Sequence, residues 1–232
     1  MSKKLFITGT GTDIGKTFVT GLLVKKLNEF GLNPAYYKAA MSGNERDEQG
    51  ILIPGDAMFV KNISGVTQPL DEMCPYVYEH AYSPHLASQI EGNPVDINIV
   101  KRGFYDVADK YDYVLVEGSG GILCPLRHDN ITLQLEDVVR ELKLPSLIIA
   151  DAGLGTINSV VLTVFYMREK GYDIKGIIFN HFHKGNILEE DNLKMCEEMT
   201  GLKVLACVED DATDIEIDIN TLKNLFDDTS KE

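Results

Sequence analysis

One stretch decides the fold of this chain: Leu5-Phe6-Ile7-Thr8-Gly9-Thr10-Gly11-Thr12-Asp13-Ile14-Gly15-Lys16-Thr17. Its first four residues form an apolar run typical of a buried strand, and the run ends at Gly9. From about Gly15 to Phe30 the apolar residues recur at helical spacing. A glycine-rich loop between a strand and a helix is the setting of a P-loop, in which backbone amides and the helix N-terminus bind phosphate.

The triplet Gly15-Lys16-Thr17 indicates that this loop binds the phosphates of a nucleotide. The lysine can reach the β- and γ-phosphates, and the threonine hydroxyl can bind Mg²⁺. The standard spacing would place the first glycine at Thr10, whereas the chain has glycine at Gly9 and Gly11, so the loop is a longer variant. A chance Gly-Lys-Thr in an ordinary strand–turn–helix is the alternative. We expect nucleotide contacts from the following loop residues: Gly11, Thr12, Asp13, Ile14, Gly15, Lys16 and Thr17.

Apolar runs alternate with helical patterns along the rest of the chain. The expected strands are 34–38, 113–116, 146–150, 176–179 and 204–206, and the expected helices begin at 84 or cover about 97–110, 132–142, 157–170 and 188–199. Residues 41–66 read as a long polar connection. The alternation predicts one α/β domain over residues 1–232, with a P-loop NTPase-like fold and a mostly parallel sheet covered by helices on both faces.

Composition limits the partners. The 232 residues include 22 basic and 36 acidic side chains, for a net charge of −14, which argues against nucleic acid or an anionic membrane as a partner. The acidic residues near the C-terminus read as a solvated face. The four cysteines match no zinc spacing, and no apolar stretch is long enough to span a membrane, so we expect a cytoplasmic protein.

Ligands of such sheets bind beyond the carboxyl ends of the strands, so the residues there are candidates for the site. Lys38 ends the second predicted strand and could neutralise charge on a phosphoryl group, or simply face solvent. Glu117 and Asp151 each follow a buried strand and compete for the role of Mg²⁺ ligand, which the pattern alone leaves open. His181 and His183 have a spacing that can bind metal, but solvent or core roles are favoured. The chain lacks the Asn-Lys-x-Asp motif usual in GTPases, which favours ATP.

Several segments, taken together and in order, resemble those of the dethiobiotin synthetase family. They are Phe6-Ile7-Thr8-Gly9-Thr10 through Gly15-Lys16-Thr17, Tyr37-Lys38 with Ser42-Gly43, Asp56-Ala57, Ser83-Pro84-His85-Leu86-Ala87, Val116-Glu117-Gly118-x-Gly120-Gly121, Pro125-Leu126, and Gly153-Leu154-Gly155-Thr156-Ile157-Asn158. The similarity covers nearly the whole chain, to about Asn180. The longer P-loop is itself typical of that family.

The resemblance implies a reaction in which ATP, CO₂ and 7,8-diaminononanoate give dethiobiotin, ADP and phosphate with Mg²⁺. One amine forms a carbamate, the carbamate attacks the γ-phosphate, and the second amine closes the ureido ring. The implied roles are charge neutralisation by Lys16 and Lys38; Mg²⁺ binding by Thr17, Asp56 and Glu117; carbamate or amine contacts from Thr12 and Ser42; close backbone approach at Gly118 and Gly121; carboxylate binding by Asn158 across a homodimer interface; and adenine recognition by Asn180.

The chain departs from the family pattern in a few places. Ala39 follows the second lysine where proline is common, and Ser119 replaces alanine. Val208-Glu209 stands where an Ile-Pro pair is frequent near the adenine, which bears on the strictness of the ATP preference. Two other classes compete with the family. Partition and septum-site ATPases carry a signature lysine where this chain has Gly11, and cobalamin amidotransferase-type synthetases usually add a glutaminase domain for which the chain is too short.

Overall fold

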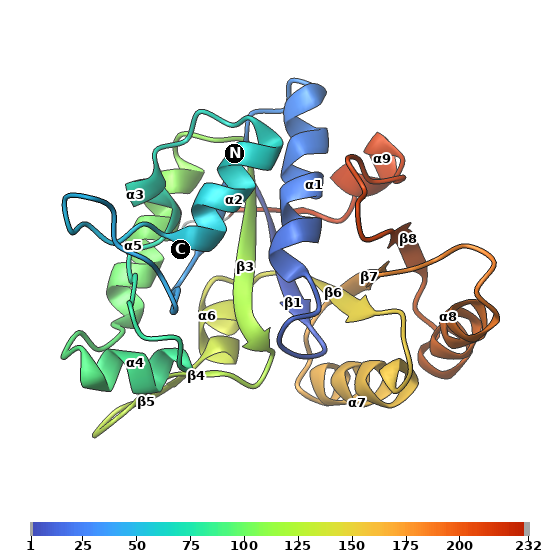
Figure 1. The fold of residues 1–232 in the computed structure, drawn as a ribbon. Coiled ribbons are helices and arrows are strands. Elements are labelled where there is room, and N and C mark those ends of the chain that lie inside the picture. The colour runs from blue at the N-terminus through green and yellow to red at the C-terminus, as the bar shows by residue number, and fades with distance from the viewer. Residues whose placement is uncertain (1, 230–232) are drawn as a thin grey trace.

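A computed structural model describes residues 2–229, whose centre is a parallel sheet with the strand order β2-β3-β1-β6-β7-β8 (Figure 1). The short β9 pairs antiparallel with β1, and β4 and β5 form a separate two-stranded sheet. The strands are β1 (Lys3–Gly9), β2 (Pro34–Lys38), β3 (Tyr113–Gly121), β4 (Pro125–His128), β5 (Thr132–Gln134), β6 (Ser146–Asp151), β7 (Ile174–Asn180), β8 (Val204–Val208) and β9 (Asp227–Asp228).

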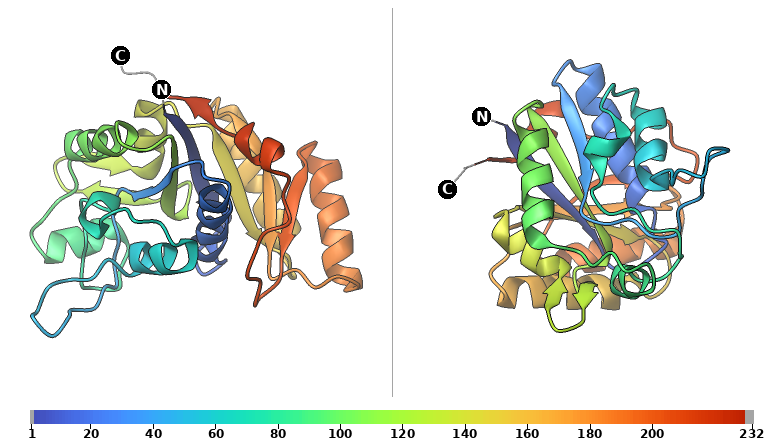
Figure 2. Two further views of the ribbon diagram at one scale, coloured as in Figure 1. Left: turned by 90° about the horizontal axis from the view of Figure 1, so that it is seen from above. Right: turned by 90° about the vertical axis from the view of Figure 1, so that its left-hand side faces the viewer.

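Helices cover both faces of the sheet (Figure 2). They are α1 (Lys16–Glu29), α2 (Gly55–Ser64), α3 (Leu70–Met73), α4 (Pro84–Ile90), α5 (Ile97–Ala108), α6 (Leu135–Glu141), α7 (Thr156–Glu169), α8 (Ile187–Thr200) and α9 (Ile219–Lys223). Within residues 2–229, none of them is both long and apolar enough to cross a membrane. The predicted fold class is confirmed.

The central strands of the sheet contain continuous apolar runs because each contributes to two cores. Successive side chains of a strand point to opposite faces. In β1, Leu5 and Ile7 therefore pack with α1, α2 and α9, whereas Phe6 between them packs with α5 and α6 on the other face. All three side chains are fully buried. A continuous apolar run is thus the signature of a central strand, and it explains why these strands were predictable.

Several boundaries differ from the predictions. The segment 41–66 is not a bare connection, because it contains α2, whose short apolar face holds Ala57 and Val60 against α1. The predicted helix over 132–142 begins only at Leu135, since 132–134 pair with β4. The strand expected at 113–116 continues through the glycine-rich end of β3 to Gly121.

The acidic segment near the C-terminus, from Glu209 to Asp228, packs against the core and is not only a solvated face. Its acidic side chains are exposed, as predicted, but Ile215, Ile217 and Phe226 are buried against the core that contains α1. The acidic residues therefore alternate with apolar anchors, and the segment follows the fold through α9 and β9 instead of leaving it.

Candidate functional site

The P-loop joins β1 to α1 at the carboxyl end of the sheet (Figure 1). Gly15 has φ of 79°, a left-handed conformation that suits glycine, and a β-carbon there would collide with the side-chain amide of Asn180. Lys16 opens α1 and its Nζ donates to the Gly11 carbonyl at 2.8 Å. The loop therefore curls around its own lysine.

A compact charged cluster lies beside the P-loop, built from the end of β2, the middle of β3 and the starts of α1 and α2. Lys38 Nζ at the end of β2 is 2.6 Å from Asp56 Oδ2 and 2.7 Å from Glu117 Oε1. The Thr17 hydroxyl donates to the same Glu117 oxygen at 2.8 Å. Because Lys38 and Glu117 are register partners on adjacent strands, their side chains are held together by the sheet itself.

The two lysines of the site differ in their electrostatic surroundings. Burial acts to lower the pKa of Lys38, but the charges of Glu117 and Asp56 and hydrogen bonds to both outweigh it and raise that pKa above its ordinary value. Burial lowers the pKa of Lys16, and the neighbouring charge of Glu117 offsets this only in part. The surroundings of Lys38 therefore stabilise its charged form, whereas the charged form of Lys16 is disfavoured by burial.

These groups line a cavity of about 480 Å³. The lining residues are Thr12, Asp13, Gly15, Lys16, Thr17, Lys38, Ala40, Met41, Ser42, Asp56, Glu117, Ser119, Gly120 and His181. The structure therefore brings together the predicted magnesium and carbamate residues, both lysines and most of the predicted loop residues. Their binding roles stay predictions.

Six predicted residues do not line this cavity: Gly11, Ile14, Gly118, Gly121, Asn158 and Asn180. Gly118 needs no ligand to explain it, because a β-carbon there would come within 2.9 Å of Phe6 and of Leu135. Gly121 packs against the backbone of β1, where a β-carbon would lie 3.3 Å from the Gly9 carbonyl. Asn158 is exposed in the first turn of α7. Packing within the protein therefore explains why glycine stands at positions 118 and 121, without a contact to a ligand.

The predicted magnesium ligands fit the ion in chemistry and placement. Thr17, Asp56 and Glu117 offer a hydroxyl and two carboxylates, the oxygen ligands that Mg²⁺ prefers. Glu117 is 1% exposed, and its Oε2 has no hydrogen-bond partner among the described residues. Asp151, the rival, accepts hydrogen bonds from Gly153 and His181 instead, which favours Glu117.

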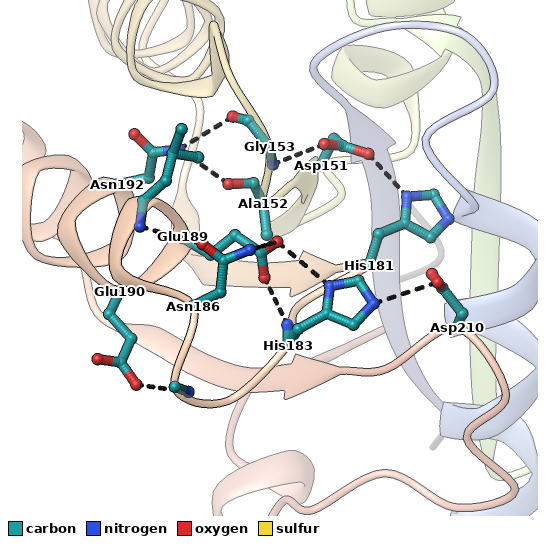
Figure 3. A network of polar contacts seen from close by, with 12 residues as sticks. Asp151, Ala152, Gly153, His181, His183, Asn186, Glu189, Glu190, Asn192 and Asp210 are labelled. Atoms are coloured by element: carbon teal, nitrogen blue, oxygen red, sulfur yellow. Dashed lines mark hydrogen bonds and ion pairs between the residues drawn. The ribbon is translucent and has the colours of Figure 1, made fainter.

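Two contributors to the site were missed from sequence. His181 reaches the cavity wall, and its ring Nδ1 lies 2.7 Å from Asp151 Oδ2 (Figure 3). The Ser119 hydroxyl donates to the Ala40 carbonyl at 3.0 Å and so ties β3 to the loop after Lys38. In the sequence, His181 was considered only for its spacing from His183, with a solvent or core role favoured, whereas its position directly after the strand-end Asn180 is the signal for this contact.

This loop, the parallel sheet beneath it and the strand-end lysine define a P-loop NTPase fold. A family model described as AAA domain matches residues 3–213. The solved MinC:MinD cell division protein complex of Aquifex aeolicus superposes with a TM-score of 0.57 at 12% identity, over 97% of this chain and 86% of that chain, a likeness of fold alone.

Relatives at higher identity narrow the class to one family. The chain is 50% identical over 228 residues to the ATP-dependent dethiobiotin synthetase BioD of Brachyspira hyodysenteriae, covering 98% of this chain and 100% of the relative. It is 46% identical over 208 residues to the protein of that name from Clostridium perfringens, covering 90% and 91%. The chain belongs to the dethiobiotin synthetase family. The resemblance seen in sequence is confirmed, and with it the prediction of an ATP-dependent ligase.

Proposed function

We propose that this protein closes the ureido ring of dethiobiotin from 7,8-diaminononanoate and CO₂, at the expense of ATP and with Mg²⁺. One amine of the substrate adds to CO₂ and loses a proton, giving a carbamate. A carbamate oxygen attacks the γ-phosphorus and ADP leaves, which forms a carbamic–phosphoric anhydride. The second amine then attacks the carbamoyl carbon and expels phosphate, so the substrate itself supplies both nucleophiles.

The observation that carries this proposal is the pair of buried ammonium groups around one cavity. Lys16 and Lys38 are 7% and 6% exposed, and both line it. Phosphoryl transfer needs positioning and cationic stabilisation of the charge on the transferred group. Thr12 and Ser42 line the same cavity and add hydroxyl donors for the carbamate or amine end. The arrangement suits a reaction in which the protein holds and neutralises its substrates.

Magnesium would be held by Thr17, Asp56 and Glu117. When bound, it would neutralise the phosphate oxygens and help align the γ-phosphoryl group. Lys38 lies between the two carboxylates, so the protein's own cation and the metal ligands share one network. The adenine of ATP would be read by Asn180, whose buried Oδ1 lacks a partner among the described residues.

The substrate carboxylate would be bound by Asn158 across a homodimer interface. The same helix, α7, exposes Leu162 at 59% and Phe165 at 64%, and Leu154 just before it is 91% exposed. A helix that presents large apolar side chains next to a predicted binding residue supports a second copy of the chain as the partner. The four free thiols favour a reducing compartment, which supports work in the cytoplasm.

The direct test is mass-spectrometric detection of dethiobiotin in reactions that contain ATP, Mg²⁺, bicarbonate and the diamine. Phosphate release should require both the diamine and bicarbonate. A Lys16→Met variant serves as the matched control for contaminating ATPases. Saturating substrates with phosphate release but without dethiobiotin would refute the proposed reaction.

A further inference from the structure

We propose that His181 is a positioning residue that fixes the amide orientation of Asn180 and thereby selects a 6-aminopurine over a 6-oxopurine. The inference rests on the proposed role of Asn180 in reading the base. It assigns a function to a histidine of the site that the mechanism above does not use.

The first observation is the conformation of His181. The residue follows β7 directly and has φ of 56°, in the left-handed region that only a few residue types tolerate. This turn places its ring between two elements, with Nδ1 at 2.7 Å from Asp151 Oδ2 and Nε2 at 3.0 Å from Asn180 Nδ2 (Figure 3 shows the Asp151 contact). The strained backbone thus positions a ring that bonds on both sides.

The second observation is the direction of the protons in this chain of bonds. The Asp151 carboxylate can only accept, so Nδ1 of His181 carries the hydrogen and Nε2 presents a lone pair. That lone pair accepts from the Asn180 amide nitrogen. Asp151 is itself held in place, because its Oδ1 accepts the Gly153 backbone N–H at 2.7 Å. Asp151 therefore determines the tautomer of His181, and His181 determines where the NH₂ group of Asn180 lies.

A second acceptor supports the same orientation. The Asn180 NH₂ group also donates to the Ile14 carbonyl of the P-loop at 3.1 Å. Turning the amide over would place its oxygen against two acceptors, the Ile14 carbonyl and the His181 lone pair. The orientation in the structure leaves Oδ1 as a buried acceptor without a partner among the described residues. An exocyclic amino group would satisfy this acceptor, whereas a purine oxygen would meet it with a second acceptor.

The experiment measures base selectivity in three variants. Asp151→Asn keeps the shape, and because its oxygen is needed by the Gly153 N–H, its NH₂ group faces Nδ1 of His181. The ring then takes the other tautomer, in which Nε2 carries the proton. This N–H faces the Asn180 NH₂ group, so two donors meet where a donor and an acceptor met before. His181→Asn removes the ring with a residue that tolerates positive φ. His183→Asn is the matched control, since that ring contacts Glu189 and Asp210.

The readouts are the KM values for ATP and ITP at saturating diamine and bicarbonate, and the dissociation constants of ADP and IDP by calorimetry. We expect both Asp151→Asn and His181→Asn to reduce the preference for the adenine nucleotide by about tenfold, the effect of one mispaired buried acceptor. The dissociation constants isolate the contribution of the base, because ADP and IDP carry the same diphosphate and differ only at position 6 of the purine. His183→Asn should keep the wild-type preference.

Three results would overturn the inference. The first is an unchanged preference in both variants, when each melts at the wild-type temperature. The second is an equal loss of preference in His183→Asn, which would assign the effect to the loop in general. The third is an Asn180→Ala variant that still prefers ADP over IDP, which would remove Asn180 from base reading. Failure of the ligase reaction is distinguishable, because it would abolish dethiobiotin in the wild type while the calorimetry still compares ADP with IDP.

Discussion

Replacing each buried lysine of the site with methionine should abolish turnover in both cases, but only the replacement of Lys38 should lower stability. Methionine retains length and apolar volume while it removes the charge. Lys38 has its pKa raised by its two carboxylate partners, so its charged form favours folding. Lys16 has its pKa lowered by burial, so its charged form opposes folding. One substitution removes a stabilising charge and the other removes a costly one.

The pH windows follow from the directions of these shifts. A lysine whose pKa is raised in the folded state contributes stability below its ordinary value of 10.5 and loses that contribution as the pH rises above it. A lysine whose pKa is lowered destabilises the fold at neutral pH, and this cost disappears as the pH rises toward 10.5. At pH 7.5 the contribution of Lys38 is at full strength, and the pH lies well below the ordinary pKa of both lysines, so this is the pH at which to compare the variants.

The magnitude follows from burial. Removing one partner of a buried ion pair costs about 3–5 kcal/mol, because the other charge is left unpaired. Glu117 is fully buried, but the Asp56 side chain is 41% exposed and the charge of Lys16 remains near, so we expect the lower end, about 3 kcal/mol, for Lys38→Met. For Lys16→Met we expect stability equal to wild type or higher, since the relief of desolvation is offset by loss of the bond to Gly11.

Urea unfolding at pH 7.5, followed by circular dichroism, separates the two cases. A loss of about 3 kcal/mol corresponds to a midpoint lower by about 1–2 M for a protein of this size. Both variants should lose at least about 100-fold in kcat, since each removes a cation from the transferred phosphoryl group. The reasoning is refuted if Lys16→Met lowers the urea midpoint as much as Lys38→Met does.

Three further outcomes are expected. Glu117→Gln should raise the Mg²⁺ concentration needed for half-maximal turnover by at least about tenfold while the diamine KM changes less, and an unchanged Mg²⁺ dependence would point back to Asp151. Phe165→Glu, on the exposed face of α7, should convert a dimer to a monomer in analytical ultracentrifugation without lowering the melting temperature; a persistent dimer would place the interface elsewhere. Burial raises the pKa of Cys74 to about 12, so iodoacetamide at pH 8 should label this thiol only after unfolding, and rapid native labelling would contradict its burial.

The parts of the fold that were predictable are those in which one physical requirement determines the residue types. A central parallel strand must be apolar on both faces, and β2 was predicted with the boundaries it has. The helix α2 was not, because it is only ten residues long and turns a few apolar side chains toward α1. The pair β4–β5 was missed because a three-residue strand carries too little periodicity to be distinguished from the helix that follows it.

The residues of the site also fall into those that were predictable from the sequence and those that were not. Lys16, Thr17, Lys38 and Glu117 could be predicted because each stands directly after an apolar run or at the start of a helix, and the topology brings those positions together. The role of His181 could not, because it depends on a positive φ and on a partner 30 residues earlier in the chain. A motif encodes its own local geometry, whereas a contact made through a backbone turn is determined only once the strands are in register.

The charges around the cavity explain how a chain of net charge −14 can hold a triphosphate. The lining residues include two ammonium groups, Lys16 and Lys38, and three carboxylates, Asp13, Asp56 and Glu117. The N-terminus of α1 adds about half a positive charge, so the charges of the side chains and the helix sum to nearly zero. These groups therefore cannot neutralise a bound triphosphate by themselves. A divalent cation held by two of those carboxylates would supply the missing charge at the γ-phosphate. We therefore infer that the carboxylates serve to bring ATP in as its magnesium complex, and that the lysines are left to act on the charge that shifts during transfer.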